Sequence, residues 1–327
     1  MTSNPLTTGP PAATAELPGS GPLPRVAGYL RDLVTLLRPA HWAKNVYSIG
    51  LVALTALPRT ATAALHLLAV AGLLVIASSI VYLGNDIADR RLDAAHPVKR
   101  HRPLASGRVG LPAALWLLAG LTALLTLLLG LTGPAAWAVG AYLALNVAYS
   151  GGLKHVPLVD AFVIALGFQL RLVAGYLAVG VSPSQWLMTS VFTVCLVLVL
   201  GKRRHELTSG VAHTRPALRG YTTALVDQML VVCSTVTIVT VVLYLYRDAP
   251  IGAFSAQAVL VSTPFLLFGL FRYLQVLLVE RGGADPVRVL LHDRALLLCI
   301  AGFSLSLLLA LIVANDVTSA PTLGSPR

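Results

Sequence analysis

Three aspartates, Asp86, Asp89 and Asp93, follow the second long apolar stretch of the sequence. In an α-helix these positions lie within an arc of about 60° on one face, because successive residues turn by about 100°. Like charges so placed repel each other, and a hard cation such as Mg²⁺ removes the repulsion and bridges to substrate phosphates. The spacing therefore predicts a metal site. The plainer alternative is a helix end whose aspartates form ion pairs with arginines close in sequence. Those arginines are Arg90, Arg91 and Arg100.

A cluster of cations follows the aspartates. Residues 96–103 read H-P-V-K-R-H-R-P and supply Lys99, Arg100 and Arg102. A metal neutralises the inner oxygens of a polyphosphate, while Lys and Arg side chains bind the outer oxygens through charge-assisted hydrogen bonds. A positively charged cytoplasmic loop explains the charge, but not its position beside three aspartates. The segment therefore favours binding of a metal-bound polyphosphate.

Further candidates for substrate binding occur at the ends of other apolar segments. Arg171 differs because it lies inside such a segment, so its partner must come from another helix or from a ligand phosphate. For the basic residues after the sixth segment, anchoring to lipid head groups is the alternative. The other candidates are Lys44, Asn45, Asn85, Tyr149, Lys154, Asp160, Lys202 and Arg203.

The composition indicates what kind of element positions these residues. The chain has 327 residues, of which 56% are hydrophobic and only 11% are charged, whereas soluble domains are about 25% charged. This excludes a soluble enzyme, a disordered scaffold and a disulfide-stapled secreted domain. The net charge of +11 indicates loop orientation and anionic ligands in a membrane protein rather than nucleic-acid binding. The expected fold class is all-α, a polytopic membrane protein.

The apolar segments and the loop charges set the expected topology. Nineteen of the 24 Lys and Arg residues fall in alternate loops on the side of the N-terminus, and positively charged loops stay in the cytoplasm. We therefore expect a multi-pass plasma-membrane protein with a cytoplasmic N-terminus and an extracytoplasmic C-terminus. Residues 1–34 are predicted to be a disordered or amphipathic tail, 35–315 the transmembrane domain and 316–327 a second tail. The nine predicted spans are 45–58, 67–84, 111–131, 134–149, 157–180, 184–200, 226–246, 255–279 and 294–314.

With these motifs identified, the chain resembles the UbiA superfamily of intramembrane prenyltransferases over residues 35–315. The pattern N-D-x-x-D-x-x-x-D at 85–93 carries the resemblance. It is joined by R-P-x-x-W-x-K-N at 38–45, Y-S-x-x-L-K-H at 149–155 and G-K-R-x-x-E-L at 201–207. The resemblance implies nine transmembrane helices enclosing a cytoplasm-facing, aspartate-lined cavity.

Within the superfamily, the same motifs are most similar to the branch that transfers phosphoribose. That similarity implies a Mg²⁺-dependent transfer of 5-phosphoribose from 5-phosphoribosyl diphosphate (PRPP) to a polyprenyl (decaprenyl) phosphate, for cell-wall arabinan synthesis. Asp86, Asp89 and Asp93 would hold Mg²⁺ against the diphosphate. The cations predicted to bind the leaving diphosphate and the 5-phosphate are Lys99, Arg100, Arg102 and Lys154. Those predicted to bind the phosphate of the lipid acceptor are Lys44, Arg171, Lys202 and Arg203.

Two other functions stay open from the sequence. One is an ordinary prenyltransferase that moves an isoprenoid chain from its diphosphate to an aromatic or other acceptor. The second is a non-catalytic transporter or lipid-binding scaffold, which three aligned aspartates beside three cations disfavour. The sequence also leaves open whether the chain forms a homo-oligomer.

Overall fold

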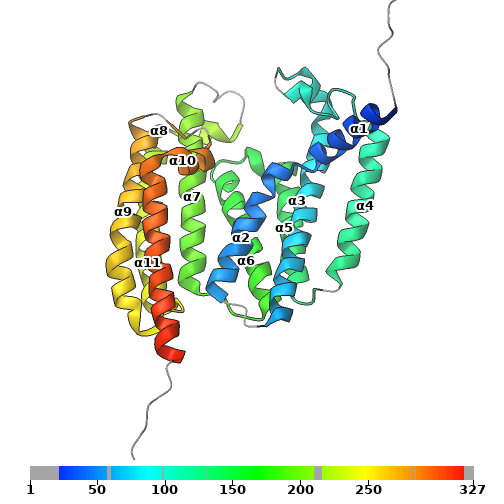
Figure 1. Cartoon of the computed structure of the whole chain (residues 1–327). Helices are drawn as coiled ribbons and strands as arrows, with labels where there is room; N and C mark the ends of the chain where they lie inside the picture. Colours follow the sequence, from blue (N-terminus) through cyan, green and yellow to red (C-terminus); the bar gives the residue numbers. More distant parts are fainter. Residues whose placement is uncertain are drawn as a thin grey trace, which may run out of the picture.

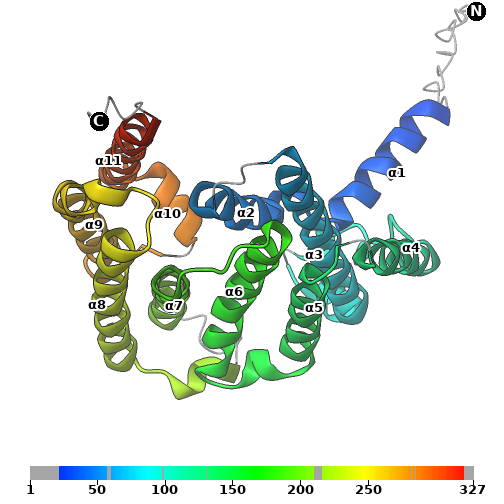
Figure 2. The same ribbon diagram turned by 90° about the horizontal axis from the view of Figure 1, so that it is seen from below.

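The protein is a bundle of α-helices that run side by side (Figure 1). Viewed end-on, α4 lies at one edge of the bundle, while α8, α9 and α11 form the other (Figure 2). Within the described ranges the chain contains helices and turns and no strand, which confirms the all-α fold class. The computed structural model describes residues 22–56, 60–97, 99–130, 132–209, 216–280, 282–283 and 285–319.

Each of the nine predicted spans overlaps a helix, but two of these helices are short. α2 (Ala43–Ala56) has 14 residues and α5 (Ala135–Gly151) has 17. Seven other helices of the described chain are long and apolar enough to cross a membrane, so the protein is a multi-pass membrane protein, while the count of nine spans stays a prediction. The seven are α3 (Ala61–Ala95), α4 (Leu111–Leu129), α6 (Val159–Val179), α7 (Gln185–Thr208), α8 (Thr223–Arg247), α9 (Ser255–Leu278) and α11 (Arg294–Ser319).

Helix α3 extends well past its predicted span. Its 35 residues make it about 52 Å long at 1.5 Å per residue, against about 30 Å of bilayer hydrocarbon. Thr60 begins the helix by accepting a 3.1 Å hydrogen bond from the backbone N–H of Ala63. The helix ends before His96, whose backbone is extended, because the residue that precedes a proline disfavours helical dihedrals. The additional turns carry the three aspartates beyond the apolar part of the helix.

Several short elements gather at the end of the bundle where the aspartates lie. α1 (Pro22–Leu36), the 3₁₀ turn η2 (Lys99–His101) and α10 (Pro286–His292) all lie there (Figure 1). α1 is fixed by Leu36, which is buried in an apolar cluster with residues of α3 and α4, and by a 3.0 Å ion pair between Asp32 and Arg108. The predicted tail boundary at residue 34 thus falls inside a helix, and residues 1–21 and 320–327 lie outside the described chain.

Close helix contacts fix the elements that surround the site. At Gly175 of α6, a Cβ atom would lie 3.0 Å from the Val52 side chain of α2. At Gly201 of α7, a Cβ atom would lie 2.7 Å from the hydroxyl of Tyr273 on α9. Both glycines let neighbouring helices approach more closely than a larger residue allows, as is common in membrane helix packing. At Gly201 the basic end of α7 therefore lies in close contact with α9.

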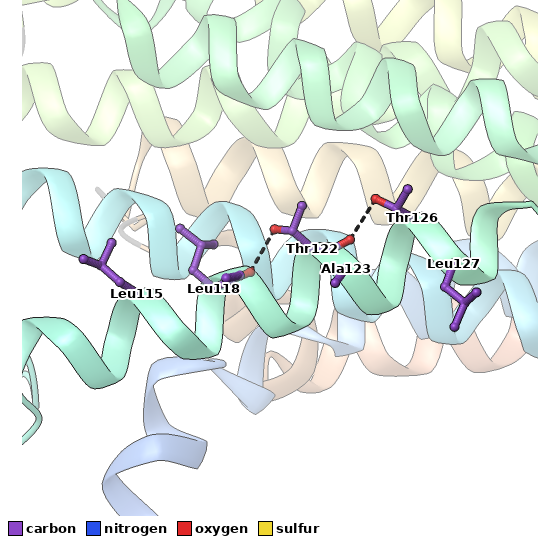
Figure 3. Close-up of a pocket in the computed structure, with 7 residues that line it drawn as sticks. Leu115, Leu118, Thr122, Ala123, Thr126 and Leu127 are labelled. Carbon is purple, nitrogen blue, oxygen red and sulfur yellow. Dashed lines mark hydrogen bonds between the residues drawn. The ribbon is translucent and has the colours of Figure 1, made fainter.

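The hollow along α4 offers no groups for phosphate chemistry. It has a volume of about 900 Å³, and all of its lining residues belong to this one helix (Figure 3). The hydroxyls of Thr122 and Thr126 donate to the backbone carbonyls of Leu118 and Thr122 at 2.8 and 2.9 Å. Its polar groups are thereby satisfied inside the helix, and the remaining lining is aliphatic. This surface suits contact with lipid chains.

Candidate active site

Two carboxylates of α3 converge on one arginine. Asp86 and Asp93 are buried, with 4% and 3% of their surface exposed. One terminal nitrogen of Arg102 lies 3.0 Å from Oδ1 of Asp86 and 2.6 Å from Oδ2 of Asp93. Arg38 donates to the same Asp86 oxygen at 2.5 Å, and Nζ of Lys99 lies 3.5 Å from Oδ1 of Asp93. Three cations therefore compensate two buried carboxylates.

Arg38 reaches Asp86 from the loop between α1 and α2. Its backbone is left-handed, with φ 52° and ψ 62°, a conformation that costs free energy in a non-glycine residue and is common at functional sites. Its guanidinium also lies over the ring of Tyr82, 5.0 Å from the ring centroid. The sequence offered Arg38 only as part of a motif, because the 48 positions that separate it from Asp86 hide the contact.

A cavity of about 870 Å³ opens beside this cluster. It joins α3 and the basic loop after it to the turn that follows α5 and to the end of α7. Five predicted site residues line it: Asp89, Asp93, Lys99, Tyr149 and Lys154. Three further polar residues line it that were not predicted as site residues: Arg38, His155 and Glu206. The sequence separates these groups by up to 168 positions, and only the packing of the helices brings them to one cavity.

Not every predicted residue of this region faces the cavity. Asn85 is half-buried on α3. Arg100 is exposed, and its Nε lies 3.4 Å from Nε2 of His101 rather than near an aspartate. Within the part of the chain that the structure describes, Arg90 and Arg91 form no ion pair with the three aspartates. Asp86 and Asp93 thus pair with Arg38, Lys99 and Arg102 rather than with the arginines that the plainer alternative named.

Asp160 lies behind the cavity in a buried network. Its Oδ2 is 2.9 Å from Nε of Arg203, and both residues are at most 1% exposed. Arg203 also pairs with Glu206, which lines the cavity. The hydroxyl of Tyr221 donates to Oδ1 of Asp160 at 2.7 Å and accepts from the N–H of Leu158 at 2.9 Å. Burial and this contact with Asp160 raise the pKa of Tyr221 above its usual range. The network connects the start of α6 to the end of α7.

Arg171 finds its partners on other helices. It donates from Nε to the side-chain oxygen of Asn45 on α2 at 2.8 Å and from Nη2 to the hydroxyl of Tyr142 on α5 at 2.9 Å. Its Nη1 donates to the carbonyl of Gly167 at 2.9 Å. Asn45 in turn donates to the carbonyl of Leu74 on α3 at 3.1 Å. The sequence left open whether Arg171 binds a group on another helix or a ligand phosphate. In the structure its partners are neutral protein groups, and these hydrogen bonds link α2, α3, α5 and α6.

Lys44 of α2 and Lys202 of α7 lie close enough to interact electrostatically. Both act electrostatically on His41: burial, and then the charges of Lys44, Arg38 and Lys202, hold the pKa of His41 below its usual range. The ring of His41 lies against Tyr82, with 4.9 Å between centroids. The positive charge around His41 comes from Arg38, Lys44 and Lys202.

The donor set of the α3 cluster fits a hard divalent cation. Carboxylate oxygens are the ligands that Mg²⁺ prefers, and it completes its shell with water and substrate phosphates. Asp86 and Asp93 present oxygens within bonding distance of a single atom, the Arg102 nitrogen, while Asp89 faces the cavity. Among the described residues, no three His, Cys, Asp or Glu side chains are already arranged around one metal position. A bound metal would therefore need oxygens from a ligand.

Comparison with known families agrees with this arrangement. Residues 46–292 match the UbiA prenyltransferase family. The protein belongs to that family. The family resemblance expected from the motifs is thus confirmed, and the chain is a membrane-embedded transferase.

Relatives of known name cover most of the chain. A decaprenyl-phosphate phosphoribosyltransferase from Corynebacterium glutamicum is 30% identical over 282 residues, which is 81% of this chain and 82% of the relative. The enzyme of the same name from Mycobacterium tuberculosis is 31% identical and covers 83% of this chain and 91% of its own length.

Solved structures share the fold at low identity. A UbiA homologue from Archaeoglobus fulgidus, solved with GPP and Mg²⁺, superposes with a TM-score of 0.60 at 17% identity, covering 89% of this chain and 99% of its own. A digeranylgeranylglyceryl phosphate synthase gives a TM-score of 0.66 at 14% identity, covering 87% and 99%. These likenesses confirm the UbiA fold.

Proposed function

We propose that the protein transfers the 5-phosphoribosyl group of PRPP to a polyprenyl phosphate, with Mg²⁺ as cofactor. The observation that carries the proposal is the cavity in which Asp89 and Asp93 face Lys99, Lys154 and Arg38. A diphosphate bound through a metal needs few further cations, whereas PRPP carries an additional phosphate on its 5-position. The two relatives named decaprenyl-phosphate phosphoribosyltransferase support the same substrates.

The aspartates and the loop cations would bind different parts of PRPP, the donor. Asp86, Asp89 and Asp93 would hold the metal, which supplies charge neutralisation at the diphosphate as it leaves. Lys99, Lys154 and the loop arginines would bind the remaining diphosphate oxygens and the 5-phosphate. As the bond from ribose C1 to the diphosphate breaks, C1 bonds to an oxygen of the acceptor phosphate. That phosphate is already an anion at pH 7, so positioning and electrostatics carry the reaction and no strong base is required.

We assign the acceptor phosphate to the corner formed by Lys44 and Lys202. Lys44 is the second residue of α2 and is half-buried, and Lys202 is exposed near the end of α7. Arg171 and Arg203, the other two candidates, already donate to protein groups in the core. Their role in this proposal is to hold the helices that carry Asn45 and Glu206. Because Lys202 is exposed, an anionic lipid head group at the membrane surface can reach it from solvent.

Substitution of the two loop lysines, Lys99 and Lys154, tests whether PRPP is the donor. We expect Lys99→Ala and Lys154→Ala each to raise the KM for PRPP by roughly tenfold to a hundredfold, because one charge-assisted contact is worth about 1.5–3 kcal/mol. The measurement uses purified protein, labelled PRPP and a polyprenyl phosphate, and follows lipid-linked phosphoribose. Arg247→Ala, at the last residue of α8, is the control and should change nothing.

A parallel assay separates the two enzymatic functions. If wild-type protein forms no phosphoribosyl lipid but consumes a prenyl diphosphate with an aromatic acceptor, the prenyltransferase alternative replaces the proposal.

The membrane orientation gives a further test. We propose that the protein lies in the plasma membrane with the cavity facing the cytoplasm and the C-terminus outside. The excess of basic residues in alternate loops supports this orientation, as do α1 and the last turn of α11, which lie at opposite ends of the bundle (Figure 1). A reporter fused after Arg327 should therefore lie outside the cytoplasm. A cytoplasmic location of this reporter would contradict the nine-span count.

A further inference from the structure

Arg38 and Arg102 use the carboxylate oxygens that a metal would need. Oδ1 of Asp86 accepts from both guanidinium groups, and Oδ2 of Asp93 accepts from Arg102. If a divalent cation bound the same oxygens as the two arginines, like charges would lie within about one hydrogen-bond length of each other and repel. Arginine and metal therefore compete for the same two carboxylates.

Both arginines lie beside the proposed diphosphate cavity, because Arg102 pairs with Asp93, which lines it. Arg38 lines the same cavity as Asp89 and Asp93, and its side chain is 22% exposed, against 31% for that of Arg102. Arg102 belongs to the loop after α3 and not to a membrane-spanning helix. A guanidinium binds carboxylate and phosphate oxygens with the same planar fork of donors. Each can change partner without losing its hydrogen bonds.

We propose that Arg38 and Arg102 exchange ion-pair partners when the donor binds. They neutralise Asp86 and Asp93 until a metal-bound diphosphate arrives, and their guanidinium groups then bind the diphosphate instead. This inference rests on the proposed function, because it takes the aspartates as the metal site. The exchange keeps the buried carboxylates compensated at every stage, which matters because an unpaired buried charge is strongly destabilising. Arg38 thereby becomes a diphosphate-binding residue, a role the sequence had not assigned to it.

The exchange makes metal and diphosphate binding cooperative. The metal alone must displace two arginines that then have no anion to bind, so its affinity is low. With diphosphate present, the displaced arginines gain a partner, and both ligands bind more tightly. Such coupling is reciprocal by linkage. Removing an arginine should therefore move the two affinities in opposite directions, whereas a merely structural arginine would lower both.

The experiment measures binding rather than turnover. Mn²⁺, as a paramagnetic substitute for Mg²⁺, is titrated alone into detergent-purified protein and followed by electron paramagnetic resonance, with Asp86→Asn as background. Labelled inorganic diphosphate is then titrated at fixed Mg²⁺. We expect Arg102→Ala to bind Mn²⁺ alone about tenfold more tightly and diphosphate about tenfold more weakly, the effect of one charge-assisted contact. Arg38→Ala should shift both affinities in the same directions by less.

A matched control comes from the same loop. Arg108 pairs with Asp32 of α1 at 3.0 Å instead of with an α3 aspartate, so Arg108→Ala should change neither affinity. Arg102→Lys keeps the positive charge and controls for a folding defect in Arg102→Ala. Its Mn²⁺ affinity should lie between those of wild type and Arg102→Ala.

Two different failures can be told apart. If Mn²⁺ binding depends on Asp86 but Arg102→Ala leaves it unchanged or weakens it, the exchange is wrong and the metal site stands. If no Mn²⁺ binding depends on Asp86, with or without diphosphate, the metal assignment of the proposed function is wrong and the exchange falls with it.

Discussion

Asp86→Asn and Asp89→Asn should each lower turnover by at least about a hundredfold, because each removes one charged oxygen ligand from the proposed metal site. Asparagine keeps the size of aspartate, and its side-chain oxygen can still accept hydrogen bonds from Arg38 and Arg102 at position 86. We therefore expect little loss of folding. Turnover is measured as lipid-linked phosphoribose at saturating PRPP and Mg²⁺, with size-exclusion profiles to verify the fold.

Asp32→Asn is the matched control for this prediction. Asp32 is an aspartate at the same end of the bundle, but it pairs with Arg108 and not with the α3 cluster. Its substitution should leave turnover within about twofold, since exposed ion pairs contribute little to stability. Near-normal turnover of Asp86→Asn at saturating Mg²⁺ would rule out the metal assignment.

The largest effect on stability is expected at the buried pair of Asp160 and Arg203. Arg203→Met removes the guanidinium and leaves the fully buried carboxylate of Asp160 without its cation. Breaking a buried pair from one side costs about 3–5 kcal/mol in free energy of unfolding. Unfolding in mixed detergent micelles measures this. Arg100→Ala, at an exposed arginine, should stay within about 0.5 kcal/mol.

A double variant identifies the cause. In Asp160→Asn/Arg203→Met the buried charge is gone, and the amide oxygen can still accept from the hydroxyl of Tyr221. The double variant should therefore be more stable than Arg203→Met alone. Equal instability of the two would mean that lost packing, not an unpaired charge, causes the effect.

Local features of the sequence predicted the helices and the acidic face. Whether a segment enters a membrane depends mainly on the transfer of about 20 consecutive residues from water, so the apolar segments were found from the sequence alone. The positions of Asp86 and Asp93 on one helical face likewise follow from their spacing of seven residues, about two turns of an α-helix. The second apolar span ends at residue 84, whereas α3 continues through the aspartates to Ala95, as expected for three aspartates on one helical face.

What only the tertiary structure decided is which charged group meets which. The pairs Arg38–Asp86, Asn45–Arg171 and Asp160–Arg203 join residues on different elements; 126 positions separate Asn45 from Arg171. Such contacts depend on how whole helices pack, through close approaches such as that at Gly201, and no local pattern encodes them. The sequence therefore predicts the chemistry of the site, whereas the packing of the helices determines the partner of each charge.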